Sequence, residues 1–431
     1  MKHAHFLGVG GIGMSALAHI LLEKGVVVSG SDLKNISHLE KLGIAHTDTL
    51  PKEGSLIYST AIKEDHPQLV EAKGLGLPLL HRSELLAELL AEKKGLLVAG
   101  THGKTGTSAL LSWVLYHAGL DPSYAVGGIL KNLGKNGGYG QGNYFVAEAD
   151  ESDGSFLHYG GEGAIITNIE KEHLDYWKTE ENLIAGFKKM ATKIQNKEFL
   201  FWCADDPLLA ALDLPGVSYG KKGTLKLLSC EQKGTKTIFS ASFEGKTYTM
   251  TLPLIGEMLA LNALAILGIA LKLGISEEKI GAAFAFYQGV KRRQEKIGEV
   301  NQIAIYDDYA HHPTEVLNLL KSFKKGLGGR RLVALFQPHR YSRTKELLAE
   351  FKGAFEEADV TLITTLYPAG EVPLPGISGK RLAQEVDGAL FLEQEKLLTE
   401  LPKMLTDGDV LVTMGAGDVT AIGPELLEKL R

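Results

Sequence analysis

Short apolar runs alternate with longer amphipathic stretches along nearly the whole chain. Runs such as His3–Val9 and Arg331–Phe336 have the length of buried strands, whereas stretches such as Met14–Lys24 carry helical periodicity. Strands that alternate with helices build parallel sheets covered by helices. The alternation therefore predicts an α/β fold, and a length of 431 residues predicts more than one domain.

A glycine-rich segment in the first third of the chain has the composition of a phosphate-binding loop. It reads Gly100-Thr101-His102-Gly103-Lys104-Thr105 and lies between the expected strand Leu96–Ala99 and the expected helix Thr105–Ala118. Backbone N–H groups of such a loop reach phosphate oxygens, the helix N-terminus adds positive potential, and a lysine and a hydroxyl complete the site. The usual pattern has its first glycine where Val98 stands, so this loop is a variant. A glycine-rich turn with an incidental Gly-Lys-Thr is the simpler alternative.

A second glycine-rich segment near the N-terminus satisfies the G-x-G-x-x-G pattern. It reads Gly8-Val9-Gly10-Gly11-Ile12-Gly13, and Asp32 follows at the end of the next expected strand. Alone, this arrangement is typical of an NAD-dependent enzyme. The same geometry accommodates any nucleotide diphosphate at a helix N-terminus. A separate ATP loop further along favours a nucleotide-linked substrate over a redox cofactor.

Three blocks of strands and helices follow one another. We expect a Rossmann-like nucleotide-binding domain over 1–94, a P-loop ATPase-like α/β domain over 95–297 and a Rossmann-like α/β domain over 298–431. Two β-rich runs, Thr237–Phe243 and Lys246–Thr251, predict a hairpin attached to the central domain.

Overall composition excludes several classes of protein. A formal net charge of −6 gives no reason to expect a nucleic-acid partner. The two cysteines, Cys203 and Cys230, lie in different contexts and predict neither a disulfide framework nor a Cys-based metal site. The uncharged stretch Ala4–Leu22 is interrupted by glycines and two histidines, so we expect neither a signal peptide nor a membrane span. These features predict a cytoplasmic protein.

Acidic residues cluster after an expected strand of the central domain. The segment Glu148-Ala149-Asp150-Glu151-Ser152-Asp153 suits a Mg²⁺-phosphate site, although a solvated acidic turn has the same composition. A later segment, Glu170–Asp175, contains His173, which could ligate a second metal or cap a helix.

Two polar segments of the third block also follow expected strands. The first reads Asp307-Asp308-Tyr309-Ala310-His311-His312-Pro313-Thr314 and the second Gln337-Pro338-His339-Arg340-Tyr341-Ser342-Arg343-Thr344. Paired arginines with a histidine and a tyrosine suit a carboxylate or phosphate. A solvated loop is the alternative, but open α/β sheets bind ligands at the carboxyl ends of their strands.

Taken together, these segments closely resemble the Mur ligase family, and the resemblance runs the whole length of the chain. It is carried by His5–Met14, Gly100–Thr105, Glu148–Phe156, Thr167–Glu170, Asp307–Glu315, Gln337–Thr344 and Ala369–Glu371. Within the family, the Gln337–Thr344 segment resembles the branch that adds the first amino acid of peptidoglycan.

The resemblance implies an ATP-dependent enzyme that joins L-alanine to the lactyl carboxylate of UDP-N-acetylmuramate through an acyl phosphate. It implies ATP with Mg²⁺, or Mn²⁺, as cofactors, and a monomer or weak homodimer. No nucleic acid or membrane is implied as a partner.

Residue roles carry over from the family position by position. UDP-substrate contacts are implied for Gly10, Gly11, Ile12, Gly13, Asp32, Ser59, Thr60, Arg82, Ser152, Thr167 and Asn168. ATP contacts are implied for Gly100, Thr101, His102, Gly103, Lys104, Thr105, Gly106, Asn262, Arg292 and Asp307. Metal ligands are implied at Thr105, Glu148 and His173, and amino-acid contacts at Tyr309, His339, Arg340 and Arg343. Catalytic roles are implied for Lys104 and Arg292, with His311 or Asp308 as the base.

Three positions depart from the family pattern. Gly106 stands where a further threonine is usual, and Glu257-Met258 replaces a His-Asn pair often found before Asn262. Related ligases carry a carbamylated lysine at the metal site; Lys188 and Lys189 lie nearby, and neither is assigned that role.

Three rival functions remain at this stage. A ligase that recycles murein tripeptide would use the same chemistry. An NAD-dependent oxidoreductase would use the N-terminal loop but leave the ATP loop unexplained. A nucleotide sensor without activity would leave the acidic and Arg/His clusters unexplained.

Overall fold

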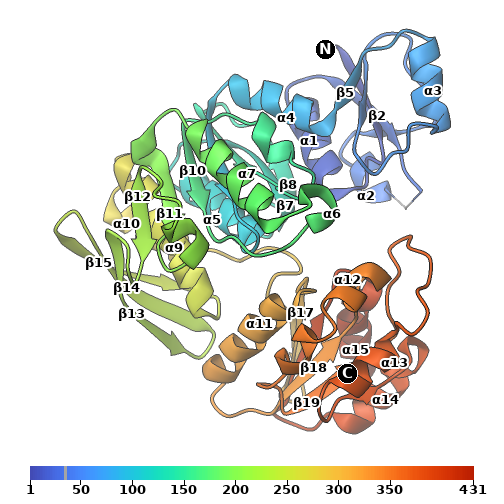
Figure 1. Ribbon diagram of the computed structural model, residues 1–431, viewed down its shortest axis with the longest axis vertical. Helices are drawn as coiled ribbons and strands as arrows, with labels where there is room; N and C mark the ends of the chain where they lie inside the picture. The colour runs from blue at the N-terminus through green and yellow to red at the C-terminus, as the bar shows by residue number, and fades with distance from the viewer. Residues whose placement is uncertain (34–35) are drawn as a thin grey trace. The chain divides into compact units, whose positions relative to one another are not determined.

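The computed structural model describes residues 1–33 and 36–431 and contains three α/β domains, each with its own sheet (Figure 1). The predicted fold class is confirmed. The chain forms two compact units, of which the first holds the N-terminal domain and most of the central domain and the second holds the C-terminal domain. The predicted boundaries after residues 94 and 297 stay predictions. Strand β6 begins at Lys94 and strand β16 at Glu295, so both boundaries fall close to the start of a strand.

The N-terminal domain is a parallel five-stranded sheet with helices. Its elements are β1 (His3–Leu7), α1 (Ile12–Glu23), β2 (Val27–Ser31), α2 (Ser37–Glu40), β3 (Ala45–His46), β4 (Ser55–Tyr58), α3 (Pro67–Gly74), β5 (Leu79–His81) and α4 (Arg82–Ala91). The strand order β3-β2-β1-β4-β5 places β1 between β2 and β4. The carboxyl end of β1 is therefore a topological switch point, and the Gly8–Gly13 segment starts there.

The central domain is built on a ten-stranded sheet of order β15-β14-β13-β12-β11-β10-β6-β9-β7-β8. Its strands are β6 (Lys94–Ala99), β7 (Ser123–Leu130), β8 (Lys135–Gly138), β9 (Tyr144–Glu148), β10 (Gly163–Ile166), β11 (Leu200–Cys203), β12 (Val217–Gly220), β13 (Leu225–Lys233), β14 (Lys236–Phe243) and β15 (Lys246–Leu252). Its helices are α5 (Lys104–His117), α6 (Leu174–Trp177), α7 (Glu180–Thr192), α8 (Pro207–Ala210), α9 (Glu257–Lys272) and α10 (Glu277–Ala285). Strand β6 lies between β9 and β10, so the phosphate loop also leaves a switch point.

The C-terminal domain has a six-stranded sheet of order β16-β17-β21-β18-β19-β20. The strands are β16 (Glu295–Val300), β17 (Ile303–Asp308), β18 (Leu332–Phe336), β19 (Val360–Ile363), β20 (Leu390–Phe391) and β21 (Val410–Met414). The helices are α11 (Pro313–Gly326), α12 (Tyr341–Glu346), α13 (Gly379–Glu385), α14 (Leu397–Met404) and α15 (Ile422–Leu430). Only β16 pairs antiparallel among these strands.

Both faces of the C-terminal sheet are buried, which explains why its strands are continuous apolar runs. Along β17, Ala304 and Tyr306 join one apolar cluster, whereas Ile303 and Ile305 join the cluster on the other face. Alternate side chains of a strand point to opposite faces, so one run serves both cores.

One detail of the predicted strands is corrected. Asp307 and Asp308 were expected to follow their strand, but both lie within β17, opposite Thr413 and Met414 of β21. They are buried because their carboxylates find hydrogen-bond donors in neighbouring segments, which compensates for the loss of water. Elsewhere the predicted strands and helices that frame the motifs are confirmed within a few residues.

Among the described residues, no helix is both long and apolar enough to cross a bilayer.

A packing prediction follows from the centre of the C-terminal core. Phe336 of β18 is fully buried, with ring centroids 5.2 Å from Phe351 and 5.4 Å from Phe355. Phe336→Ala removes this ring and leaves a cavity, so we expect the local unfolding free energy to fall by about 3–5 kcal/mol. Hydrogen exchange of the β17, β18 and β21 amides measures this local unfolding free energy. Val372→Ala, at an 80% exposed position, is the control, and equal protection in both variants would contradict the prediction.

Candidate active site

The phosphate loop is braced by the residues that follow β10. The Thr167 hydroxyl donates to the carbonyl of His102 at 2.7 Å, and the Asn168 side chain both accepts from His102 N at 2.8 Å and donates to its carbonyl at 3.0 Å. Gly100 has φ +133°, and a Cβ there would lie 2.0 Å from the Thr167 hydroxyl. Only glycine fits this position. Thr167 and Asn168 thus fix the shape of the phosphate loop, and their predicted contact with the UDP substrate stays a prediction.

Asn262 of α9 lies against the same loop. A Cβ on Gly103, which has φ +83°, would lie 2.6 Å from the Asn262 amide nitrogen. The Asn262 side chain is buried, and its amide oxygen has no hydrogen-bond partner. Buried polar atoms are rarely unpartnered. The oxygen is therefore suited to accept a hydrogen bond from a bound nucleotide, as predicted for this residue.

Lys104 begins helix α5 and is held by carboxylates. Its Nζ lies 2.6 Å from Glu151 Oε2 and 3.7 Å from Asp150 Oδ1. Burial alone would lower the pKa of Lys104, but Glu151 and Asp150 raise it above its ordinary value, so the ammonium stays charged. Burial also raises the pKa of Glu151 above its usual range. The loop therefore keeps the charged Lys104 ammonium beside the Glu151 carboxylate. The ammonium can exchange this partner for a phosphate oxygen.

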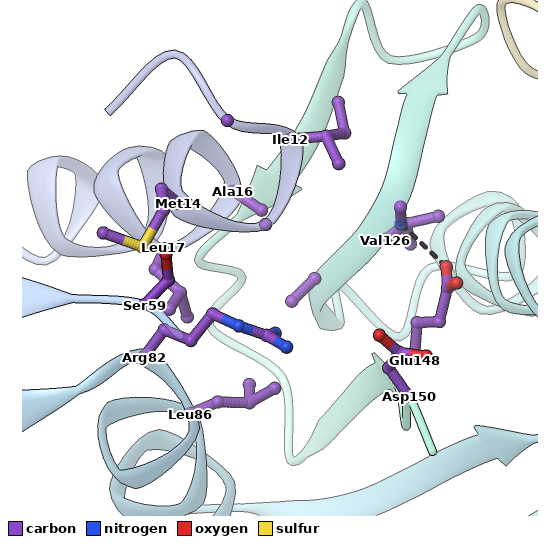
Figure 2. Close-up of a pocket in the computed structure, with 14 residues that line it drawn as sticks. Ile12, Met14, Ala16, Leu17, Ser59, Arg82, Leu86, Val126, Glu148 and Asp150 are labelled. Atoms are coloured by element: carbon purple, nitrogen blue, oxygen red, sulfur yellow. Dashed lines mark hydrogen bonds between the residues drawn. The ribbon is translucent and has the colours of Figure 1, made fainter. Parts of the chain in front are cut away.

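Thr105 and Glu148 form an oxygen-lined cradle at the ends of α5 and β9. The Thr105 hydroxyl donates to Glu148 Oε1 at 3.1 Å. Gly127 N of β7 donates to Glu148 Oε2 at 2.8 Å, the hydrogen bond dashed at Glu148 in Figure 2. A Cβ on Gly127 would lie 2.6 Å from Glu148 Oε2 and 3.0 Å from the Thr105 hydroxyl, so any side chain there would fill the cradle. Carboxylate and hydroxyl oxygens are the ligands Mg²⁺ prefers. The residues present fit the implied metal.

His173, the other predicted metal ligand, is the N-cap of α6. It has φ +57°, and its Nε2 lies 3.7 Å from Glu172 Oε2. The left-handed backbone is uncommon for a residue with a side chain and turns the chain sharply at this point. His173 thus occupies the N-cap position without a side-chain capping hydrogen bond, and its role as a metal ligand stays a prediction.

The N-terminal glycine loop leads into the N-terminus of α1. Gly10 N donates to Asp32 Oδ2 at 2.8 Å, and a Cβ on Gly10 would lie 2.9 Å from that oxygen. Asp32 therefore holds the loop, besides its predicted ribose contact. Helix α1 has Gly11 as its N-cap, so free N–H groups of its first turn are available to a diphosphate.

A cavity of about 320 Å³ lies between this loop and the metal cradle. Its lining comes from both domains of the first unit: Gly11, Ile12, Gly13, Met14, Ala16, Leu17, Ser59, Arg82, Leu86, Ala125, Val126, Gly127, Glu148 and Asp150. Figure 2 shows the Arg82 side chain directed from the α1 side toward Glu148 and Asp150. The structure thus brings the predicted UDP-binding loop and the predicted metal site onto one cavity.

Two further predicted UDP-binding residues, Thr60 and Ser152, are linked to the lining of this cavity through carboxylates. Arg82 pairs with Asp153 at 3.1 Å, and the Thr60 hydroxyl lies 3.5 Å from the same carboxylate. Ser152 donates to Asp150 at 2.7 Å. These polar groups at the border suit the sugar and phosphate groups of a nucleotide-linked substrate.

In the C-terminal domain, Arg292 is held by backbone and aromatic contacts. Its guanidinium donates to the carbonyls of Gly415 at 2.8 Å and Gly417 at 3.1 Å, and lies 4.8 Å from the Tyr309 ring centroid. Its Nε, 3.8 Å from Asp307, is buried without a hydrogen-bond partner. The predicted nucleotide contacts of Arg292 and Asp307 stay predictions.

Four of the residues predicted to hold or activate the amino acid cluster together in this domain. The ring of His311 lies 5.4 Å from that of Tyr309 and 6.3 Å from that of His339, and Arg343 Nη1 lies 3.3 Å from His339 Nδ1. Burial, then Arg343, lowers the pKa of His339 to about 3, so this imidazole is neutral at physiological pH. The cluster pairs a neutral ring with a cationic guanidinium.

Arg340 has φ +69°, and its N–H donates to the carbonyl of Tyr367 at 2.9 Å. Tyr367 also stacks on His339 with centroids 5.6 Å apart. Positive φ in a side-chain-bearing residue marks a position at which function or packing overrides local preference. Tyr367 supports two predicted amino-acid contacts, and no sequence pattern indicated it.

Other residues that shape the site were also missed. Gly127 lies in a strand that sequence periodicity did not predict. The Gly415–Gly417 turn follows the predicted strand Val410–Met414, and its two glycines directly after a strand were a signal that could have located it.

Fold and site define an ATP-dependent ligase of three domains. The chain belongs to the Mur ligase family: the family models described as "Mur ligase family, catalytic domain", "Mur ligase middle domain" and "Mur ligase, glutamate ligase domain" match residues 3–94, 98–270 and 292–417. The middle-domain match covers the ATP loop, which the oxidoreductase alternative left unexplained. The middle and C-terminal matches cover the acidic and Arg/His clusters, which the sensor alternative left unexplained.

Individual relatives match over the full length. The UDP-N-acetylmuramate–L-alanine ligase of Protochlamydia amoebophila is 42% identical, covering 99% of this chain and 98% of that protein. That of Desulforamulus reducens is 41% identical, covering 100% and 98%. The solved UDP-N-acetylmuramate-alanine ligase of Thermotoga maritima has a TM-score of 0.85 and 29% identity, covering 99% and 98%. A murein peptide ligase from Psychrobacter arcticus has a TM-score of 0.71 and 25% identity, covering 100% and 99%.

The metal cradle yields a first prediction. Gly127→Ala places a methyl group between Glu148 and Thr105, so we expect a loss of Mg²⁺-dependent turnover of roughly 100-fold. Gly281→Ala in α10 is the control, because the nearest atom to its Cβ would be Met250 Sδ at 3.8 Å. Turnover rates across a Mg²⁺ titration measure the effect. A Gly127→Ala enzyme as active as the control would show that the cradle does not hold the metal.

Asp308 yields a prediction on pH dependence. Its carboxylate accepts from Gln294 N at 2.7 Å and Ala310 N at 2.8 Å, but burial dominates and raises its pKa to about 6. Well below pH 4 the Asp308 carboxyl is protonated in folded and unfolded chains alike. As pH rises through the ordinary pKa toward 6, the unfolded chain releases the proton first, so the folded state loses stability. Between pH 4 and pH 8 the stability of Asp308→Asn should therefore rise relative to wild type by up to about 3 kcal/mol. Urea unfolding of both proteins at pH 4 and pH 8 measures their difference in unfolding free energy. The same difference at both pH values would refute a raised pKa for Asp308.

Proposed function

We propose that this chain joins L-alanine to the lactyl carboxylate of UDP-N-acetylmuramate and converts ATP to ADP and phosphate, as a step in peptidoglycan precursor synthesis. The observation that carries the proposal is the shared cavity. One wall is a diphosphate-binding loop, and the other carries the cradle next to the phosphate loop and Lys104. Full-length relatives at 42% and 41% identity are UDP-N-acetylmuramate–L-alanine ligases, and they support the same substrates for this chain.

The chemistry is derived from the two halves of the site. A carboxylate is a poor electrophile, so the substrate carboxylate oxygen attacks the γ-phosphorus of ATP, and the bond to the β,γ-bridging oxygen breaks to release ADP. The amine of L-alanine then attacks the acyl carbon. Collapse of the tetrahedral adduct expels phosphate and leaves the amide. Lys104 neutralises charge on the transferred phosphoryl group, for which it must leave Glu151.

A magnesium ion, held by Thr105 and Glu148, would supply positive charge to the phosphate oxygens during this transfer. Gly127 contributes by leaving space and by orienting the Glu148 carboxylate through its N–H group. Mn²⁺ prefers similar oxygen ligands, so we expect it to substitute.

The amine of L-alanine must lose a proton before it attacks. The geometry favours His311 over Asp308 as the acceptor. Both oxygens of the Asp308 carboxylate already accept backbone N–H groups. His311 Nδ1 lies 3.0 Å from the Tyr309 carbonyl, so a proton on Nδ1 leaves the lone pair on Nε2 for a base. Arg340 and Arg343 are proposed to bind the L-alanine carboxylate.

We place the enzyme in the cytoplasm, because the reaction consumes ATP and the proposed substrates are small molecules. Its proposed state, a monomer or weak homodimer, rests on the family resemblance alone. The second candidate acceptor is murein tripeptide, which the structural similarity to a murein peptide ligase makes worth testing. Selectivity among L-alanine, glycine and L-serine depends on small differences in free energy that the motifs do not encode.

Phosphate release from ATP tests the proposal. With Mg²⁺ and UDP-N-acetylmuramate, we expect release to require L-alanine and to fall by roughly 1,000-fold or more in Lys104→Ala, because the transferred charge loses its cation. Lys246→Ala, on the exposed β14–β15 turn, is the matched lysine control. Release with murein tripeptide instead would assign the chain to the recycling activity. Phosphate release that needs no acceptor would refute the proposal.

A further inference from the structure

The β7–β8 hairpin of the central domain packs directly on helix α1 of the N-terminal domain. The side chain of Asn136, in β8, is only 2% exposed, and its amide nitrogen donates to the carbonyl of Ile12 at 2.6 Å and to the Ser15 hydroxyl at 3.0 Å. Ile12 and Ser15 belong to the first turn of α1, next to the diphosphate-binding loop. A residue of one domain thus holds the substrate-binding end of a helix in the other.

The two backbones approach closely beside this contact. A Cβ on Gly137 would lie 2.3 Å from the carbonyl oxygen of Ala16, so a side chain there would force the hairpin and α1 apart. At the rim, Glu23 of α1 pairs with Lys135 and accepts from Tyr139 N at 2.7 Å. The buried amide and the glycine therefore form the inner part of this joint between the domains.

The same hairpin also reaches the metal cradle, close to this joint. Gly137 of β8 pairs with Ala125 of β7, and Gly127, two residues further along β7, donates to Glu148. A short series of hydrogen bonds and paired strands therefore connects the Ile12 carbonyl to the Glu148 carboxylate. The walls of the cavity that carry the two ligand sites are linked through this hairpin.

A second tie crosses the cavity, from Arg82 to Asp153, but it differs in kind. The Arg82 side chain is 21% exposed and borders the cavity, where a diphosphate would compete for its guanidinium. A bound substrate can displace this ion pair, whereas no group of the substrate can replace the buried Asn136 amide between β8 and α1. The Asn136 contact is the tie that persists when the cavity is filled.

We propose that Asn136 is a positioning residue: it fixes the distance between the diphosphate loop at the start of α1 and the Thr105–Glu148 cradle. The inference rests on the proposed function, in which one wall holds the nucleotide-linked carboxylate and the other the ATP. Asn136 acts through Ile12 and β8. Phosphoryl transfer needs the attacking oxygen in line with the phosphorus within a few tenths of an ångström, so the rate depends on this spacing.

Two variants disturb the joint by different routes. Asn136→Asp keeps the shape of the side chain but sets a carboxylate against the Ile12 carbonyl, and Gly137→Ala pushes against Ala16. Asn132→Asp is the matched control, because it makes the same change on the same hairpin, where Asn132 bonds Phe286 O and Gln288 N of the central domain.

Binding and turnover are measured separately. For Asn136→Asp and Gly137→Ala we expect UDP and Mg²⁺-ADP to bind at full stoichiometry with Kd within about threefold of wild type, while kcat for L-alanine-dependent phosphate release falls about tenfold or more. Hydrogen exchange of the first hydrogen-bonded amides of α1, residues 15–18, should rise in both variants while that of β6 and β9 is unchanged. The Asn132→Asp control should keep its kcat within about twofold.

A kcat within about twofold of wild type in Asn136→Asp would overturn the inference. So would loss of UDP or ADP stoichiometry, since Asn136 would then support folding of a site instead of its spacing. Failure of the proposed function is a separate result, in which wild type shows no L-alanine-dependent release. In that case unchanged exchange of the amides of residues 15–18 in α1 would still overturn the role of Asn136, and faster exchange confined to these amides would support it.

Discussion

The Glu148 carboxylate is the interaction on which the arrangement of the site depends. One oxygen accepts from Thr105 at the start of α5 and the other from Gly127 in β7, so a single side chain fixes the phosphate loop, the end of β9 and the hairpin strand relative to one another. A carboxylate in that place is held by two donors and still offers lone pairs to a cation. Strand β7 also leads to the joint with α1. The position of Glu148 therefore affects both the cradle and the glycine loop at the start of α1.

The sequence predicted the framework well because glycine, charge and periodicity each have a local cause. Phosphate loops need glycines between a strand and a helix, and Gly100–Thr105 and Gly8–Gly13 could be located from that pattern alone. The strands of the C-terminal domain were recognisable because burial on both faces demands continuous apolar runs such as Val410–Met414.

What the sequence did not predict depends on contacts between segments far apart in the chain. Strands β7 and β8 contain several glycines and polar residues, so periodicity missed them, yet Gly127 and Asn136 act only through neighbours brought in by folding. Likewise Thr167 and Asn168, assigned to the substrate by resemblance, brace the phosphate loop, and Asp308 lies inside a strand because donors from Gln294 and Ala310 reach it there.

The pairing of Lys104 with Glu151 also affects which anions the loop accepts. A bare buried ammonium would attract any small anion, including free phosphate and sulfate. Here such an ion must displace a carboxylate already 2.6 Å away, and the exchange of one anionic partner for another yields little net attraction. A triphosphate would add contacts with the loop backbone and with a cation in the cradle, and these additional contacts would favour its binding. The internal carboxylate would thereby make the loop discriminate between nucleotides and small anions such as free phosphate.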